Sequence, residues 1–113
     1  MIAAGALVAA LGVATTTGAD ARPAATYKLS AAKTGLKFNV STIRARAGRV
    51  TLSMANPSGF PHGVAIKGKG TGKTVRKGGT STVTATLKKG TYTFYCPVPG
   101  HAAGGMKGKL IVS

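Results

Sequence analysis

The stretch from residue 90 to residue 112, GTYTFYCPVPGHAAGGMKGKLIV, decides the fold that we expect for this chain. At both of its ends large apolar residues alternate with small or polar ones, and Pro and Gly fill the middle. A period of two indicates β-strands, and Gly and Pro mark the turn between them. The stretch therefore predicts strands over residues 91–96 and 107–113, joined by a loop of small residues.

The same alternation occurs upstream, in short segments separated by Gly, Pro and basic turns. We expect strands over residues 26–31, 37–43, 49–56, 62–68 and 82–87. The Gly- and Lys-rich segment 67–81 predicts a long solvated loop. No stretch repeats every three or four residues. Seven or eight short strands with turns about every ten residues predict an all-β fold, a Greek-key β-sandwich of two sheets.

The first residues have a different character from the rest of the chain. Residues 1–19, MIAAGALVAALGVATTTGA, are uncharged, and Ala19-Asp20-Ala21 is a small-x-small sequence suited to signal peptidase. We therefore interpret residues 1–21 as a signal peptide and residues 22–113 as a single domain. Export places that domain in the periplasm or outside the cell.

Two alternatives to this interpretation stay open. No Lys or Arg precedes Arg22, although an export signal normally begins with one, so the natural start of the chain could lie upstream. The first segment could also remain as an anchor that holds the domain on the membrane. However, its strongly apolar part, residues 2–13, is shorter than the roughly 20 residues that span a bilayer.

The charge of the chain restricts its partners. It has 16 Lys and Arg residues and one acidic residue, Asp20, so residues 22–113 contain no side-chain carboxylate. Nucleic acid is the usual partner of such a domain, but an exported protein does not meet the genome. The basic residues also lack the interleaved aromatic residues of a base-stacking surface. We expect instead an acidic protein partner, an anionic membrane or a cell-wall polymer.

Cys96 is the only cysteine, so it cannot form a disulfide within the chain. It also lies too far from the apolar first segment to be a lipoprotein cysteine. Three roles remain for it: a buried inert thiol, a cross-link to another chain, or a metal ligand. The cysteine alone favours the inert thiol, and its surroundings change that interpretation.

In three of the predicted strands, the inward face ends in a residue that can bind a metal. These residues are Cys96 after Tyr92 and Phe94, His62 before Val64 and Ile66, and Met106 before Leu110 and Val112. Each one adjoins a turn rich in Gly or Pro. The pattern predicts that the three side chains meet at one end of the sandwich, inside the core.

The spacing CxxxxHxxxxM adds His101 to this set. A thiolate, two imidazoles and a thioether form a soft ligand set that suits copper. A trigonal His2Cys site with a weak axial Met is the geometry used for electron transfer. Such a site takes three ligands from one loop, here Cys96, His101 and Met106, and one from a distant strand, here His62.

With NPSGFPHGVAI at residues 56–66, the stretch 90–112 resembles the plastocyanin and azurin family of cupredoxins. The resemblance covers nearly all of residues 24–113 in strand order. The longer Cys-to-His spacing is similar to that of the rusticyanin and sulfocyanin branch. The resemblance implies a type 1 (blue) copper site with His62, Cys96 and His101 as strong ligands and Met106 as the axial ligand.

The sequence departs from the family at two positions. Many cupredoxins have Asn after the first histidine, which ties the two ligand loops together, and this chain has Gly63. We expect the Gly63 backbone N–H to donate to the Cys96 sulfur. Pro97 has no N–H, so a second donor would have to come from Val98 or beyond. Both departures bear on the reduction potential.

Two further residues near the strands have simpler interpretations. Met54 lies on the inward face of the predicted strand 49–56 and is expected in the core. Asn56 either anchors the turn before His62 or forms an ordinary Asx turn.

These observations predict a blue copper electron carrier that is not an enzyme and acts as a monomer. Four ligands leave no open position for a substrate. We expect His101 to be the electron exit, with an acidic redox partner docked near it and an apolar patch of Phe60, Pro61 and Val98 beside it. One alternative is a copper carrier that delivers the metal to another exported protein. Another is a metal-free cationic module that binds anionic surfaces.

Overall fold

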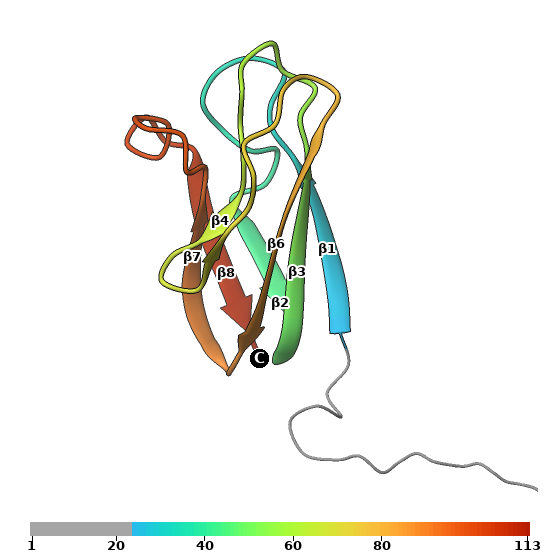
Figure 1. Cartoon of the computed structure of the whole chain (residues 1–113). Coiled ribbons are helices and arrows are strands. Elements are labelled where there is room, and N and C mark those ends of the chain that lie inside the picture. Colours follow the sequence, from blue (N-terminus) through green and yellow to red (C-terminus); the bar gives the residue numbers. More distant parts are fainter. Residues whose placement is uncertain (1–23) are drawn as a thin grey trace, which may run out of the picture.

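The computed structural model describes residues 24–113, and the predicted signal segment, residues 1–21, lies outside them. Within the described part the chain forms eight strands and no helix. The strands form two sheets that pack face to face (Figure 1). No helix of residues 24–113 could therefore cross a membrane. The prediction of an all-β sandwich with seven or eight strands is confirmed.

The strands are β1 (Ala24–Ser30), β2 (Thr42–Ala45), β3 (Gly48–Ala55), β4 (Ala65–Ile66), β5 (Gly70–Thr71), β6 (Thr80–Leu87), β7 (Gly90–Tyr95) and β8 (Lys107–Val112). One sheet has the order β1-β3-β6, and the other has the order β2-β8-β7-β4-β5. β1 pairs with β3 and β2 pairs with β8 in parallel, whereas the other pairs are antiparallel.

The core lies between the two sheets and follows the period-two pattern. In β3, Val50, Leu52 and Met54 are fully buried, while the residues between them face outward. Phe94 of β7 and Leu110 of β8 meet them from the other sheet and are equally buried. The prediction that Met54 is a core residue is confirmed.

The strand predicted over residues 37–43 forms only in its last part, as β2. Phe38 makes an isolated bridge with Ala31, and its ring packs against Phe94 with the ring centroids 5.4 Å apart. Thr42 pairs with Lys109 in the parallel register of β2 and β8. Residues before position 40 would therefore lie opposite the loop that precedes β8, so they have no strand to pair with.

The segment 67–81 contains more pairing than a solvated loop would have. β5 pairs with β4, and Val75 forms a bridge with His62 further along. Gly70 and Gly72 let the backbone of this segment pass close to neighbouring strands. A Cβ at position 72 would lie 2.6 Å from the carbonyl oxygens of Val64 and Thr82. The loop prediction was therefore wrong for the residues that support His62.

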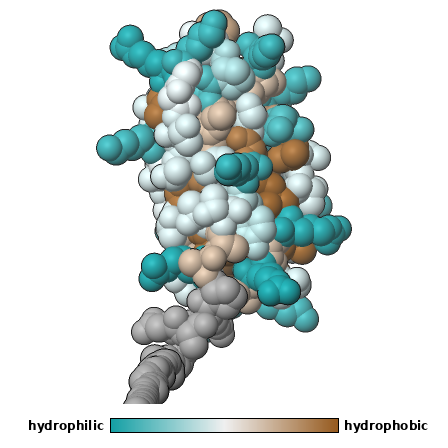
Figure 2. All heavy atoms as spheres, turned by 90° about the vertical axis from the view of Figure 1, so that its right-hand side faces the viewer, coloured by the Kyte–Doolittle hydropathy of each residue, from teal (hydrophilic) through white to brown (hydrophobic). Residues whose placement is uncertain are grey.

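The connections that carry the predicted ligands lie at one end of the sandwich. The C-terminus and the turn between β6 and β7 lie at the opposite end (Figure 1). On the side of the molecule that carries β1, hydrophilic side chains project separately from a surface that is mostly pale and hydrophobic in places (Figure 2). This end-to-end arrangement separates the ligand-bearing loops from the chain terminus.

Candidate metal centre

The turn before His62 is built around the buried side chain of Asn56. Its Nδ2 donates to the carbonyl oxygens of Phe60 (2.8 Å) and Val75 (2.9 Å), and its Oδ1 accepts from the backbone N–H of Ser58 (2.9 Å). The two interpretations of Asn56 are therefore both correct. One side of the amide forms an Asx turn, and the other side ties that turn to a distant segment.

His62 is held by backbone bonds on both sides of its peptide unit. Its N–H donates to the Val75 carbonyl (3.1 Å), and the Val75 N–H donates back to the His62 carbonyl (2.8 Å). The Ser81 hydroxyl accepts from the Val64 N–H (3.2 Å) and donates to the Lys73 carbonyl (2.6 Å). Val64 and Ser81 are buried, so these bonds fix the backbone beside His62, whose side chain is fully buried.

Gly63 makes the close contact between the two ligand segments. Its N–H donates to the Sγ of Cys96 at 3.5 Å, as the sequence predicted. A Cβ at this position would lie 2.8 Å from the Lys73 carbonyl oxygen and 3.3 Å from Cγ of Pro97. The structure therefore has no space for the side chain that many cupredoxins carry after the first histidine.

The loop between β7 and β8 is closed by its own backbone. The Cys96 N–H donates to the Met106 carbonyl (3.0 Å), and the Met106 N–H donates to the His101 carbonyl (3.0 Å). Gly100 and Gly105 have φ angles of 84° and 115°, a left-handed conformation that favours glycine. These turns bring the ends of the loop together at the point where Tyr95 pairs with Lys107.

Three predicted ligands converge on one point. The two Nδ1 atoms of His62 and His101 are 3.2 Å apart, and the Sγ of Cys96 lies 3.5 Å from Nδ1 of His101 and 3.9 Å from Nδ1 of His62. A point equidistant from three atoms with this spacing lies about 2.1 Å from each of them, close to the lengths of metal–nitrogen and metal–sulfur bonds. The triangle therefore fits a metal ion.

The electrostatics of the site agree with this fit. Burial, and then the neighbouring His101, lower the pKa of His62 from its ordinary value of 6.5. His62 is therefore neutral at neutral pH, and neutral imidazole is the form that binds metals. Its Nε2 is buried without a hydrogen-bond partner in the part of the chain that the structure describes.

Met106 completes the predicted set from the other end of the loop. Its side chain is fully buried, and its backbone bonds to both Cys96 and His101. Cys96 is also buried, at 1% exposure, and His101 is only partly buried. Among the predicted ligands, His101 is thus the one that reaches the surface. Phe60, from the expected apolar patch, is 61% exposed.

Two residues that support the site were not predicted from the sequence. Ser81 lies at the start of β6 and positions the backbone beside His62. Leu36 lies against the ligand loop, since a Cβ at Gly104 would be 2.8 Å from its Cδ1. Both contacts join segments far apart in the chain, and neither residue type is unusual in its local pattern.

Comparisons with known proteins agree with this architecture. Auracyanin B has a structure with a TM-score of 0.72 and 25% identity, over 81% of this chain and 91% of that one. Auracyanin A, described as a "blue" copper protein from the green thermophilic photosynthetic bacterium Chloroflexus aurantiacus, has a TM-score of 0.70 and 22% identity, over 80% and 100%.

A larger protein shares the same fold. The blue copper oxidase from Nitrosomonas europaea has a TM-score of 0.67 and 22% identity, over 78% of this chain and 38% of that one. No curated protein matches this chain in sequence. The family model of the cupredoxin-like domain matches residues 3–112. With the sandwich and its convergent ligands, this match shows that the chain belongs to the cupredoxin-like domain family.

Proposed function

We propose that this protein is a one-electron carrier with a single type 1 copper ion held by His62, Cys96, His101 and Met106. The observation that carries the proposal is the triangle of donor atoms, with sides of 3.2, 3.5 and 3.9 Å. A copper ion bound there supplies the one-electron Cu(II)/Cu(I) couple. Thiolate, imidazole and thioether ligands are those that suit this metal.

The surroundings of the ligands support rapid electron exchange. Hydrogen bonds to Val75 and to Ser81 fix the His62 segment, and the loop backbone fixes Cys96. Ligands that cannot move hold nearly the same geometry in both oxidation states, so little reorganisation accompanies electron transfer. His101 reaches the surface between small residues, where a redox partner can approach the edge of its ring.

We further propose that the carrier is exported and acts as a monomer. The uncharged first segment and its small-x-small end support export. The likeness in fold to auracyanins supports a carrier rather than an enzyme. The buried positions of Cys96 and Met106 argue against a delivery protein, because a protein that hands over copper must expose its ligands to the acceptor.

The test is the absorption spectrum of the protein loaded with Cu(II). We expect an intense blue colour that disappears on reduction, because the Cys96 thiolate donates charge to the oxidised metal. Cys96→Ser should remove the colour, whereas Met54→Leu, a change at a buried methionine of the core, should keep it. A colourless Cu(II) form of the natural sequence would refute the proposal.

Competition for the metal separates a carrier from a delivery protein. The proposed function predicts that Cu(I) leaves slowly when a soluble Cu(I) chelator is added in excess. Rapid and complete transfer to the chelator would favour the delivery function instead.

A further inference from the structure

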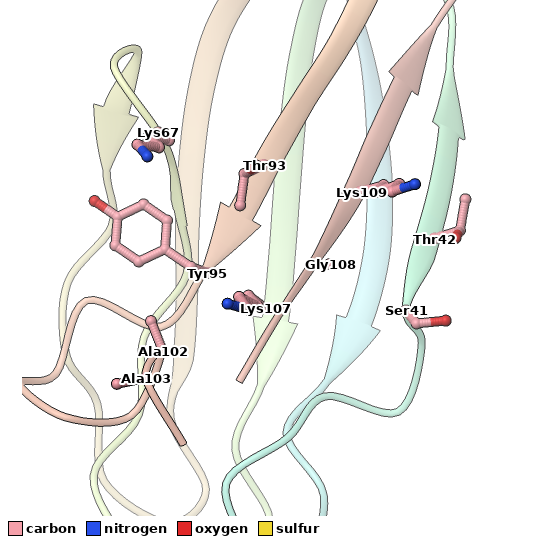
Figure 3. A pocket seen from close by; sticks show the side chains of 10 residues that line it. All are labelled: Ser41, Thr42, Lys67, Thr93, Tyr95, Ala102, Ala103, Lys107, Gly108 and Lys109. Carbon is pink, nitrogen blue, oxygen red and sulfur yellow. The ribbon is translucent and has the colours of Figure 1, made fainter. Parts of the chain in front are cut away.

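A hollow of about 790 Å³ lies on the outward face of the five-stranded sheet, next to the ligand loop (Figure 3). Three lysines line it: Lys67 after β4, and Lys107 and Lys109 of β8. Thr93 and Tyr95 line it as well. None of these side chains belongs to the predicted metal ligands.

Strand register explains why the lysines gather there. Lys109 pairs with Thr93 and Lys107 pairs with Tyr95, and the backbone N–H of Lys67 donates to the Thr93 carbonyl at 2.9 Å. Paired residues in adjacent strands point to the same face of a sheet. The three lysines therefore lie on the same face of the sheet as Thr93 and Tyr95.

This positive charge has no acidic side chain to pair with among the residues that the structure describes. Residues 24–113 contain no side-chain carboxylate, and all three lysines are exposed. Cations that gather in a hollow repel one another, and a hollow lined by one sign of charge concentrates the field that attracts an anion. The face therefore favours a negatively charged group from another molecule.

We propose that this hollow binds an acidic segment of a partner protein, in extended conformation, beside the ligand loop. Side chains two residues apart on one face of a strand are separated by about 6.7 Å. Lys107 and Lys109 have this separation, and so do carboxylates at alternate positions of an extended peptide. The hydroxyl groups of Thr93 and Tyr95 can donate further hydrogen bonds to the same carboxylates.

The position of the hollow indicates a role for the acidic segment of the partner. This role rests on the proposed function. Ala102 and Ala103, the two residues after His101, form one wall of the hollow. A partner whose acidic segment occupies it is therefore held next to the ligand that reaches the surface. A bilayer is flat on this scale and cannot enter a concave site as a peptide can, so the shape favours a protein.

The probe is a synthetic decapeptide of alternating Glu and Ser, added to the ¹⁵N-labelled, reduced protein loaded with copper. We expect its binding to shift the NMR signals of Thr93, Tyr95, Lys107 and Lys109, and to weaken as salt is added. The triple variant Lys67→Gln, Lys107→Gln, Lys109→Gln should weaken binding by at least about tenfold.

A matched triple variant, Lys28→Gln, Arg49→Gln, Lys88→Gln, removes the same charge from exposed positions outside the hollow. Binding in this variant should weaken by no more than about threefold. Equal losses in the two triple variants would overturn the proposal, because they would show a response to net charge alone. Phosphatidylglycerol vesicles that shift these signals when the peptide does not would also overturn it.

The readout separates this proposal from the proposed function. The signals belong to residues of the sheet, so they report binding whether or not copper is held. A colourless Cu(II) protein that still binds the peptide in the hollow would refute the copper carrier alone. A blue protein that does not bind the peptide in the hollow would refute the docking site alone.

Discussion

The two segments that supply the proposed ligands are built in opposite ways. Residues 56–66 are fixed from outside by hydrogen bonds to Val75 and Ser81, which are distant in the chain. Residues 96–106 close on themselves through backbone bonds within the loop. A single distant ligand needs tertiary contacts to hold it, whereas a loop that carries three ligands can set their spacing locally.

The space around one glycine in each segment shows the same difference. A Cβ at Gly63 would meet the Lys73 carbonyl oxygen at 2.8 Å, and a backbone atom moves less easily than the end of a side chain. A Cβ at Gly104 would meet the end of the Leu36 side chain, also at 2.8 Å. Because a leucine can change its rotamer, the ligand loop tolerates changes that the His62 segment does not.

The largest effect is expected from removing the anchor of the His62 segment. Asn56→Ala deletes three hydrogen bonds made by a buried side chain, which should lower the free energy of unfolding by about 3 kcal/mol. Denaturant unfolding of the copper-free protein measures this loss. Asn39→Ala is the control, since exposed Asn39 accepts a single bond, from the Ser30 N–H, and should cost under about 1 kcal/mol. Equal losses of stability in the two variants would show that Asn56 stabilises the protein no more than an exposed asparagine does.

The second-largest effect is expected when each of the two glycines is replaced by alanine. Gly63→Ala should cost about 2 kcal/mol of stability and weaken copper binding, because the new methyl group forces the Lys73 and Pro97 segments apart. Gly104→Ala should cost under about 1 kcal/mol and keep the blue colour. Unfolding curves and spectra of both variants measure the difference. A larger loss of stability in Gly104→Ala than in Gly63→Ala would mean that the ligand loop is the more rigid of the two segments.

A smaller effect is expected in the pH dependence of the free energy of unfolding. The folded-state pKa of His62 is lowered, so below about pH 6.5 the unfolded chain binds a proton that the folded copper-free domain does not. The free energy of unfolding should therefore fall as the pH decreases through this range. It should level off below the folded-state pKa of His62, because residues 24–113 have no side-chain carboxylate left to titrate.

Unfolding measurements between pH 3 and pH 8 test this expectation, and His62→Gln should flatten the curve. A steep loss of stability that continues below pH 4 in both proteins would contradict it. In that case a group other than His62 would set the acid limit, because the charge of the Lys and Arg residues does not change between pH 3 and pH 8.

The parts of the site that sequence reasoning found are those with a local pattern. Strand parity placed Cys96 and Met106 on inward faces, and the structure buries both. His62 was found because its own segment alternates with Val64 and Ile66. Parity says which face a side chain takes but not which strand lies opposite, so Ser81 and Leu36 were not predicted.

The segments that were predicted wrongly failed for the same reason. Residues 67–81 read as a loop because Gly and Lys dominate them, yet Val75 pairs with His62. Residues 37–39 alternate like a strand, yet in the parallel register of β2 and β8 they lie opposite the loop before β8 and have no partner in that strand. In both cases the deciding contact comes from a segment distant in the sequence, which composition does not reveal.

The smallest effect is expected at the axial ligand of the self-closed loop. Met106→Leu should keep copper and the blue colour but raise the reduction potential, because a thioether donates weakly to Cu(II) and its loss disfavours the oxidised form. A change of about 1 kcal/mol corresponds to roughly 45 mV for a one-electron couple. Met54→Leu, an equally buried change in the core, should leave the potential unaltered, as redox titration of both variants can measure. Equal shifts would mean that Met106 acts through packing, and loss of copper from Met106→Leu would mean that the loop needs all three of its ligands to hold the metal.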